Sequence, residues 1–167
     1  MENKIYKQSQ LLGDLLLAKG WKITTVESCT GGGISSAITE VAGSSGYFDC
    51  AYVTYSNEAK HRLVGVNTET LNTYGAVSDE TVHEMAMGAL NAANANVAIA
   101  ISGIAGPGGG TELKPVGTVW LAIATRDSTQ VEKSTVWSQC FTFSGDRSEI
   151  RQKATEVSLI KACELVG

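Results

Sequence analysis

A run of five apolar residues at 97–101 restricts the fold of this chain more than any other feature. The run, Val-Ala-Ile-Ala-Ile, is apolar on both faces when it is extended. A strand of this kind lies in the middle of a sheet, where helices cover it on both sides. The chain has 167 residues, of which 43% are hydrophobic, and this suffices for one domain with a real core. We therefore expect an α/β protein.

Helical and extended patterns alternate on either side of that run. Apolar residues at helical spacing, together with capping signals, predict helices over 5–19, 34–41, 57–64, 79–93 and 146–160. Segments rich in β-branched or alternating residues predict further strands over 21–26, 50–55, 117–125 and 131–143, the last two as an antiparallel hairpin. A polar loop containing Gly75 is expected before the helix at 79. This order predicts a three-layer α/β/α sandwich on a mixed, mainly parallel sheet of five or six strands, with residues 1–167 as a single domain.

The charge and hydropathy of the chain argue against several classes of function. The formal net charge is −4 and the isoelectric point is about 5.2, whereas a nucleic-acid surface needs clustered lysine and arginine. No apolar run approaches the roughly 20 residues of a membrane-spanning helix. The first residues, Met1-Glu2-Asn3-Lys4, lack the pattern of a signal peptide. We therefore expect a cytoplasmic protein that binds neither nucleic acid nor membrane.

The cysteines and histidines are too scattered to predict a metal site. No cysteine lies in a Cys-x-x-Cys pair and neither histidine has metal-motif neighbours; these residues are Cys29, Cys50, Cys140, Cys163, His61 and His83. A reducing compartment also argues against a disulfide framework. We expect neither a metal ion nor a cofactor.

Three polar clusters follow the ends of predicted strands, at 27–33, 55–60 and 102–110. In a mainly parallel open sheet the carboxyl ends of the strands lie at one edge, where ligands bind. We therefore expect the three clusters to share one pocket, although they are far apart in the sequence.

Ser28, between a predicted strand and a predicted helix, has two interpretations. Its hydroxyl can cap the helix, or it can act as a nucleophile beside free N–H groups. A nucleophilic serine needs a base, and neither histidine lies in a suitable cluster. Lys60 is the better candidate, because a helix N-terminus and partial burial would lower its pKa, and Tyr55 could relay the proton or orient the amine. The plainer alternative is an exposed lysine and a tyrosine at the edge of the core.

Cys29 is a rival nucleophile, because a helix N-terminus can depress the pKa of a thiol. Successive residues usually point in different directions, so Ser28 and Cys29 are not expected to share one role. A small buried cysteine is the simpler interpretation.

Two glycine-rich segments, 31–33 and 102–110, can present backbone donors to a phosphate or an oxyanion. Neither carries a Walker lysine or a Gly-x-Gly-x-x-Gly pattern in the right context, so ordinary glycine turns remain the alternative. Arg147, at the start of the last helix, could pair with a phosphate or carboxylate, or lie solvated on the surface.

Taken together, six blocks make the chain similar to the CinA C-terminal domain family from about residue 6 to residue 160. They are Glu-Ser-Cys-Thr-Gly-Gly at 27–32, Tyr-Ser-Asn-Glu-Ala-Lys at 55–60, Gly-Ala-Val-Ser at 75–78, Ser-Gly-Ile-Ala-Gly-Pro at 102–107, Lys-Pro-Val-Gly-Thr-Val at 114–119 and Phe-Ser-Gly-Asp-Arg at 143–147. The chain most resembles the stand-alone members of the family that act as nicotinamide-nucleotide amidohydrolases.

The resemblance implies a function and a role for each site residue. The family hydrolyses the carboxamide of nicotinamide mononucleotide to nicotinate mononucleotide and ammonia, on an α/β/α sandwich and without a metal. Carried over, Ser28 is the nucleophile, and Lys60 and Tyr55 activate it. The implied substrate or oxyanion contacts are Thr30, Gly31, Gly32, Ser102, Gly103 and Gly106, with Arg147 holding the phosphate. The pyrophosphatase of longer members belongs to a further domain and is not carried over.

Two alternatives to this enzyme stay open. One is a non-catalytic nucleotide-binding or interaction module, and the other is hydrolysis of a different amide or a phosphate ester. The half-exposed strand at 134–143 also leaves a homo-oligomeric contact at the sheet edge open.

Overall fold

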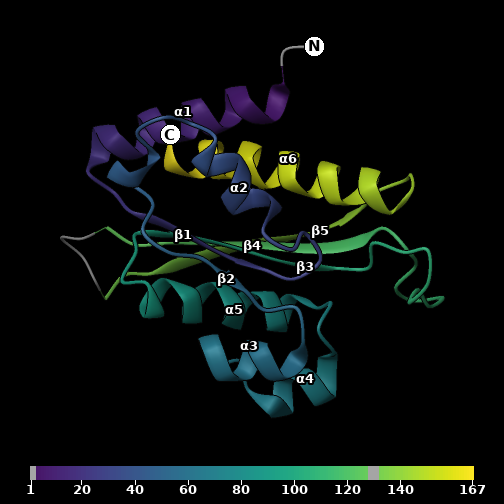
Figure 1. Cartoon of the computed structure of the whole chain (residues 1–167). Coiled ribbons are helices and arrows are strands. Elements are labelled where there is room, and N and C mark those ends of the chain that lie inside the picture. Colours follow the sequence, from purple (N-terminus) through teal and green to yellow (C-terminus); the bar gives the residue numbers. More distant parts are fainter. Residues whose placement is uncertain (1–2, 128–131) are drawn as a thin grey trace.

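A sheet between two layers of helices organises the chain (Figure 1). The computed structural model describes residues 3–127 and 132–167. Within them the sheet has five strands, in the order β2-β1-β3-β4-β5. Their bounds are β1 Ile23–Glu27, β2 Tyr52–Val53, β3 Val97–Gly103, β4 Thr118–Thr125 and β5 Thr135–Thr142. β1 pairs in parallel with β2 and β3, whereas β4 runs antiparallel to both β3 and β5. Four strands therefore point the same way, which confirms a mixed, mainly parallel sheet.

The helices divide between the two faces of the sheet, as Figure 1 shows. One layer holds α1 Lys4–Lys19, α2 Gly33–Thr39 and α6 Arg147–Val166. The other holds α3 Asn57–Val64, α4 Thr68–Tyr74 and α5 Asp79–Ala92. A 3-10 turn, η1, spans Ser44–Gly46 between α2 and β2. The three-layer α/β/α arrangement is confirmed. None of the helices in the described residues is both long and apolar enough to cross a bilayer.

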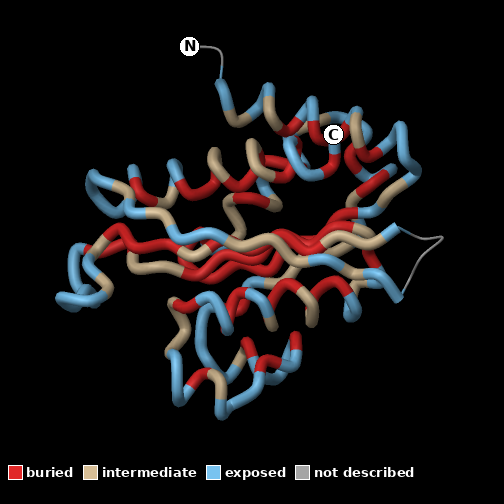
Figure 2. Tube along the Cα trace, turned by 180° about the vertical axis from the view of Figure 1, so that it is seen from behind, coloured by how far each residue is buried: buried red, intermediate tan, exposed pale blue. Residues whose placement is uncertain are grey.

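β3 is the buried central strand that the apolar run predicted (Figure 2). Its larger side chains, Val97, Ile99 and Ile101, belong to the core beneath α1, α2 and α6. Its alanines, Ala98 and Ala100, belong to the core beneath α3, α4 and α5. The two faces of one strand thus serve two cores, and small residues let α5 pack closely on the sheet.

Several boundaries differ from the sequence predictions; the helix expected over 146–160, for example, extends to Val166. The expected strand at 50–55 pairs only over Tyr52–Val53, because β2 is an edge strand in register with only the last two residues of β1. The helix expected over 34–41 ends at Thr39. The segment expected as a polar loop containing Gly75 holds α4, a seven-residue helix that buries only Leu71 and so gives almost no periodic signal. β5 covers Thr135–Thr142 of the predicted 131–143, and residue 131 lies outside the described residues.

Candidate active site

The three predicted polar clusters meet in one cavity at the edge of the sheet where β1 and β3 end. The cavity has a volume of about 200 Å³. All three clusters line it, together with the loop before α5 and the start of α6; the lining residues are Ser28, Cys29, Tyr55, Asn57, Lys60, Ala76, Val77, Ser102, Gly103, Ala105 and Arg147. The prediction of a shared pocket is confirmed.

Ser28 is held by the backbone of the sheet and of the following turn. Its N–H donates to the carbonyl of Ile101 in β3 at 3.0 Å, so the residue continues the β1–β3 pairing. Its own carbonyl accepts from the N–H of Gly31 at 3.0 Å, which closes the turn. The residue is only 8% exposed, and it lines the cavity. Ser28 therefore presents its hydroxyl from a fixed backbone.

Lys60 meets that hydroxyl from the other side of the cavity. Its Nζ lies 3.0 Å from Ser28 Oγ and donates to the carbonyl of Thr54 at 2.8 Å. The residue is 1% exposed, and burial lowers the pKa of its amine from 10.5 to about 8. No carboxylate within the described residues forms an ion pair with it. A neutral amine at hydrogen-bonding distance from a serine hydroxyl is equipped to take its proton.

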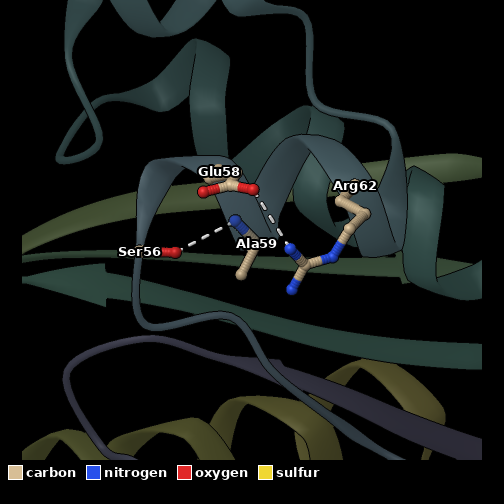
Figure 3. A network of polar contacts seen from close by, with 4 residues as sticks. All are labelled: Ser56, Glu58, Ala59 and Arg62. Carbon is tan, nitrogen blue, oxygen red and sulfur yellow. Dashed lines mark hydrogen bonds and ion pairs between the residues drawn. The ribbon is translucent and has the colours of Figure 1, made fainter.

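The start of α3 carries Lys60 and is fixed by a local cap (Figure 3). Ser56 Oγ accepts from the N–H of Ala59 at 3.0 Å, as a helix-capping serine does. Glu58 and Arg62 form an ion pair at 3.2 Å on the exposed side of the helix. Lys60 lies on the opposite, buried side of α3. The helix therefore keeps the solvated charges of Glu58 and Arg62 away from the buried amine.

Glu27 lies beside the candidate active site, and none of the sequence patterns predicted a role for it. It ends β1, is 0% exposed, and its carboxylate accepts five hydrogen bonds. The donors are the hydroxyls of Thr25, Thr30 and Ser35 and the N–H groups of Ile34 and Ser35, at 2.6 to 3.1 Å. Glu27 thus ties β1 to the first turn of α2. A glutamate that ends an otherwise uncharged strand was the available signal.

Thr30, Gly31 and Gly32 lie behind the cavity rather than in its lining. Thr30 is buried and gives its hydroxyl to Glu27 at 2.6 Å. Gly31 and Gly32 have φ values of +59° and +102°, which side chains rarely adopt, so they shape the turn into α2. Their predicted role as substrate contacts stays a prediction.

Only some of the N–H groups at 29–33 are free to meet a ligand. Those of Gly31 and Gly33 donate to the carbonyls of Ser28 and Thr30. Those of Cys29, Thr30 and Gly32 donate to no other residue within the described ranges. Of these three residues only Cys29 lines the cavity, so its N–H is the free donor placed to meet a ligand there.

Cys29 lines the cavity but is poorly placed for nucleophilic chemistry. It is 5% exposed, and burial raises the pKa of its thiol from 9.0 to about 11. The thiolate is the reactive form of cysteine, and a thiol with this pKa is protonated at neutral pH. These properties favour the interpretation as a small buried residue.

Arg147 and Tyr55 form the rim of the cavity. The guanidinium of Arg147 donates to the Tyr55 hydroxyl at 2.8 Å and to the carbonyl of Gly106 at 2.7 Å. Tyr55 is 60% exposed, and the hydrogen bond of its hydroxyl is to Arg147 rather than to Lys60. The structure thus places Tyr55 and Gly106 against the arginine, and leaves one face of the guanidinium beside the cavity.

Ser102 and Gly103 end β3 and form the third wall. Ser102 is buried and lines the cavity. A Cβ on Gly103 would lie 2.7 Å from Val119 Cγ2 and 2.9 Å from the carbonyl of Thr118, so only glycine fits against β4 there. In the described residues no group of three histidine, cysteine, aspartate or glutamate side chains could hold a metal ion.

Comparison with known proteins gives one family. The family model of the CinA C-terminal domain matches residues 5–165. A protein named nicotinamide-nucleotide amidohydrolase PncC from Enterobacter agglomerans is 52% identical over 158 residues, which is 95% of this chain and 93% of that protein. A protein of the same name from Escherichia coli K12 is 49% identical over 95% of this chain and 92% of its own length. The crystal structure of the competence/damage inducible protein CihA from Agrobacterium tumefaciens superposes with a TM-score of 0.92 at 41% identity, covering 99% of this chain and 97% of that one.

Proposed function

The chain belongs to the CinA C-terminal domain family, and on that premise we propose that it hydrolyses the carboxamide of nicotinamide mononucleotide. The products are nicotinate mononucleotide and ammonia, and residues 1–167 act as one amidohydrolase domain. The relatives that carry this activity in their names match it over nearly their whole length. The single observation that supports a mechanism is the 3.0 Å contact between Ser28 Oγ and a buried Lys60 amine with a pKa of about 8.

In the proposed first step Ser28 attacks the carboxamide carbon. Neutral Lys60 takes the hydroxyl proton as the O–C bond forms, and it remains anchored on the carbonyl of Thr54. We assign the stabilisation of the tetrahedral oxyanion to the free N–H groups of the turn after Ser28, of which that of Cys29 belongs to the cavity lining. Lys60 then gives its proton to the nitrogen, the C–N bond breaks, and ammonia leaves an ester on Ser28.

The second step returns the enzyme to its starting state. Water attacks the ester carbon and Lys60 takes one of its protons. The ester C–O bond breaks, the proton on Lys60 returns to Ser28 Oγ, and nicotinate mononucleotide leaves as the carboxylic acid, whose proton then passes to the released ammonia or to solvent. The two half-reactions consume one water and leave Lys60 neutral, so the balance needs no other reactant.

Arg147 supports the binding of a mononucleotide in this orientation. Its guanidinium lines the cavity and is fixed by Tyr55 and Gly106. A guanidinium binds phosphate with two parallel hydrogen bonds, so we assign the 5′-phosphate to Arg147 and a positioning role to Tyr55.

Ammonia release from nicotinamide mononucleotide tests the nucleophile. We expect Ser28→Ala to lose at least about a thousandfold in kcat, because the acyl-enzyme cannot form. Cys29→Ala should stay within about tenfold of the wild type, and Ser45→Ala, an exposed serine on η1, is the matched control. Loss in Cys29→Ala with activity kept in Ser28→Ala would assign the thiol instead. No turnover by the wild type, with nucleotide binding still seen by calorimetry, would favour the non-catalytic binding module.

A further inference from the structure

A second cavity lies on the other side of the loop that carries Ser28. It is lined by residues of α1, α2 and α6, is open to solvent, and has a volume of about 430 Å³, roughly twice that of the candidate active site. Small-molecule sites have volumes of about 300–1,000 Å³, so this one is large enough for a ligand of nucleotide size. Nothing in the proposed reaction uses it.

Arg151 is the group in this cavity with the greatest unused capacity to bind a ligand. Its Nε donates to the carbonyl of Cys29 at 3.0 Å, and one terminal nitrogen donates to the carbonyl of Thr30 at 3.1 Å. Both partners are neutral, and no carboxylate in the described ranges forms an ion pair with the guanidinium. An arginine has five N–H donors, so three remain after these two contacts. A half-buried guanidinium that lines a cavity and has unused N–H donors is suited to bind an anion.

The rest of the lining suits the body of a small organic anion. Tyr6 and Ile5 supply an aromatic and an aliphatic surface from α1. Ser36 and Gln152 add neutral polar groups, and Glu40 adds a carboxylate that can accept from a hydroxyl or an amine. A mononucleotide has this distribution of groups, with an anionic end, sugar hydroxyls and a flat ring.

We propose that this cavity binds a small organic anion of the mononucleotide class, with its phosphate or carboxylate on Arg151. The site is distinct from the reaction centre, where Arg147, located a helical turn earlier on α6, has the corresponding role. The two cavities are coupled by the loop between them, because Arg151 contacts the carbonyls of the two residues that follow Ser28. A ligand that holds Arg151 in place therefore stiffens the segment that supplies the nucleophile and its oxyanion donors.

Amide chemical shifts in an NMR titration locate the ligand without reference to activity. The probe is nicotinate mononucleotide. Separate titrations with inorganic phosphate and with nicotinate show which anionic group is bound. We expect saturable shifts at Gly33, Ser36 and Gln152, which line this cavity alone. Hydrogen exchange of the amides at 29–33 should slow at the same concentrations.

A matched pair of arginine variants decides the assignment. Arg151→Gln should weaken binding at Gly33, Ser36 and Gln152 by about tenfold or more, because a charge-assisted contact is lost, whereas Arg147→Gln should keep it. Ser36→Tyr, which fills the cavity from its exposed side and leaves Arg151 intact, should abolish the same shifts and serves if Arg151→Gln does not fold. Shifts confined to Ala76 and Gly103, or no saturable shift at millimolar probe, would overturn the proposal, and either result would leave the proposed amidase standing.

Discussion

Two ionisable side chains are fully buried at the same edge of the sheet, and their surroundings differ. Glu27 accepts five hydrogen bonds and is not among the residues that line the candidate active site. Lys60 makes two hydrogen bonds and lines the candidate active site. Thr54 joins them, because its N–H donates to the carbonyl of Glu27 and its carbonyl accepts from Lys60. The two side chains are thus linked through the same backbone segment, but the number of hydrogen bonds that each makes differs.

The difference separates a structural charge from a reactive one. A buried charge is tolerated when hydrogen bonds replace its hydration, and the five donors do so for Glu27. A protonated lysine has three donors, and Lys60 has two partners. Losing one proton leaves two donors and a lone pair, so the neutral amine can donate to Thr54 and accept from Ser28. The incomplete solvation of Lys60 therefore favours the form that the proposed reaction needs.

Replacing Lys60 should give the largest effect, and it should fall on activity alone. We expect Lys60→Met to lower kcat for ammonia release by about a thousandfold, within the range of lost general-base catalysis. The free energy of unfolding in urea should stay unchanged or increase, because the variant removes a buried charge of similar shape. Lys153→Met, at an exposed position on α6, is the control. Activity that survives in Lys60→Met would remove the distinction between the two buried charges.

Replacing Glu27 should reverse this pattern. Glu27→Gln puts an NH₂ group among donors, so at least one hydroxyl or N–H group loses its partner. We expect the free energy of unfolding to fall by about 3 kcal/mol, measured in urea. The activity per folded molecule should fall less than in Lys60→Met. Glu164→Gln, which alters an exposed ion pair, should change stability by less than about 1 kcal/mol. Equal losses of stability in the two variants would contradict a structural role for Glu27.

The sequence predicted Lys60 better than Glu27, for a physical reason. Lys60 follows a strand end and a helix-capping serine, and both can be recognised from neighbouring residues in the sequence. The structural role of Glu27 depends on five hydrogen-bond donors, and three of these belong to residues seven or eight positions further along the chain. Ala76 and Val77 stand in one of the six family blocks but were given no role in the site, because small apolar side chains carry no chemical signal of their own.

The fold was predictable where burial is periodic and not where it is slight. The apolar run at 97–101 and the stripes of α1 and α5 led to the layers and the sheet. α4 buries one leucine and β2 pairs over two residues, so neither had enough apolar contact to mark its bounds. The hydrogen bond of Tyr55 to Arg147 joins residues 92 positions apart, which no local pattern contains.

The pH dependence of activity reports the ionisation of Lys60 directly. With a folded-state pKa of about 8, kcat/KM should rise about tenfold per pH unit below 8 and level off above it. The unfolded chain, with a lysine pKa near 10.5, binds more protons than the folded one between pH 8 and 10.5. The Lys60 contribution to stability should therefore increase with pH across that window and be absent in Lys60→Met. A pH–rate profile that is flat between 6 and 9 would show that this amine is not the base.

The smallest effect should come from the helix that carries Lys60. Ser56→Ala removes the hydroxyl that caps α3 and should cost about 1 kcal/mol of unfolding free energy in urea. Arg62→Ala, which breaks the exposed ion pair on the same helix, should cost less than about 0.5 kcal/mol and is the internal control.

The activity of Ser56→Ala and Arg62→Ala tests whether the cap of α3 is needed to position Lys60. Glu27 is held by five bonds of its own, whereas the position of Lys60 depends on how firmly the first turn of α3 is fixed. A frayed first turn lets the amine move away from Ser28, so Ser56→Ala should lower kcat about threefold more than Arg62→Ala at equal folded fraction. Equal kcat values would mean that the contacts of Lys60 with Ser28 and Thr54 position the amine without the cap.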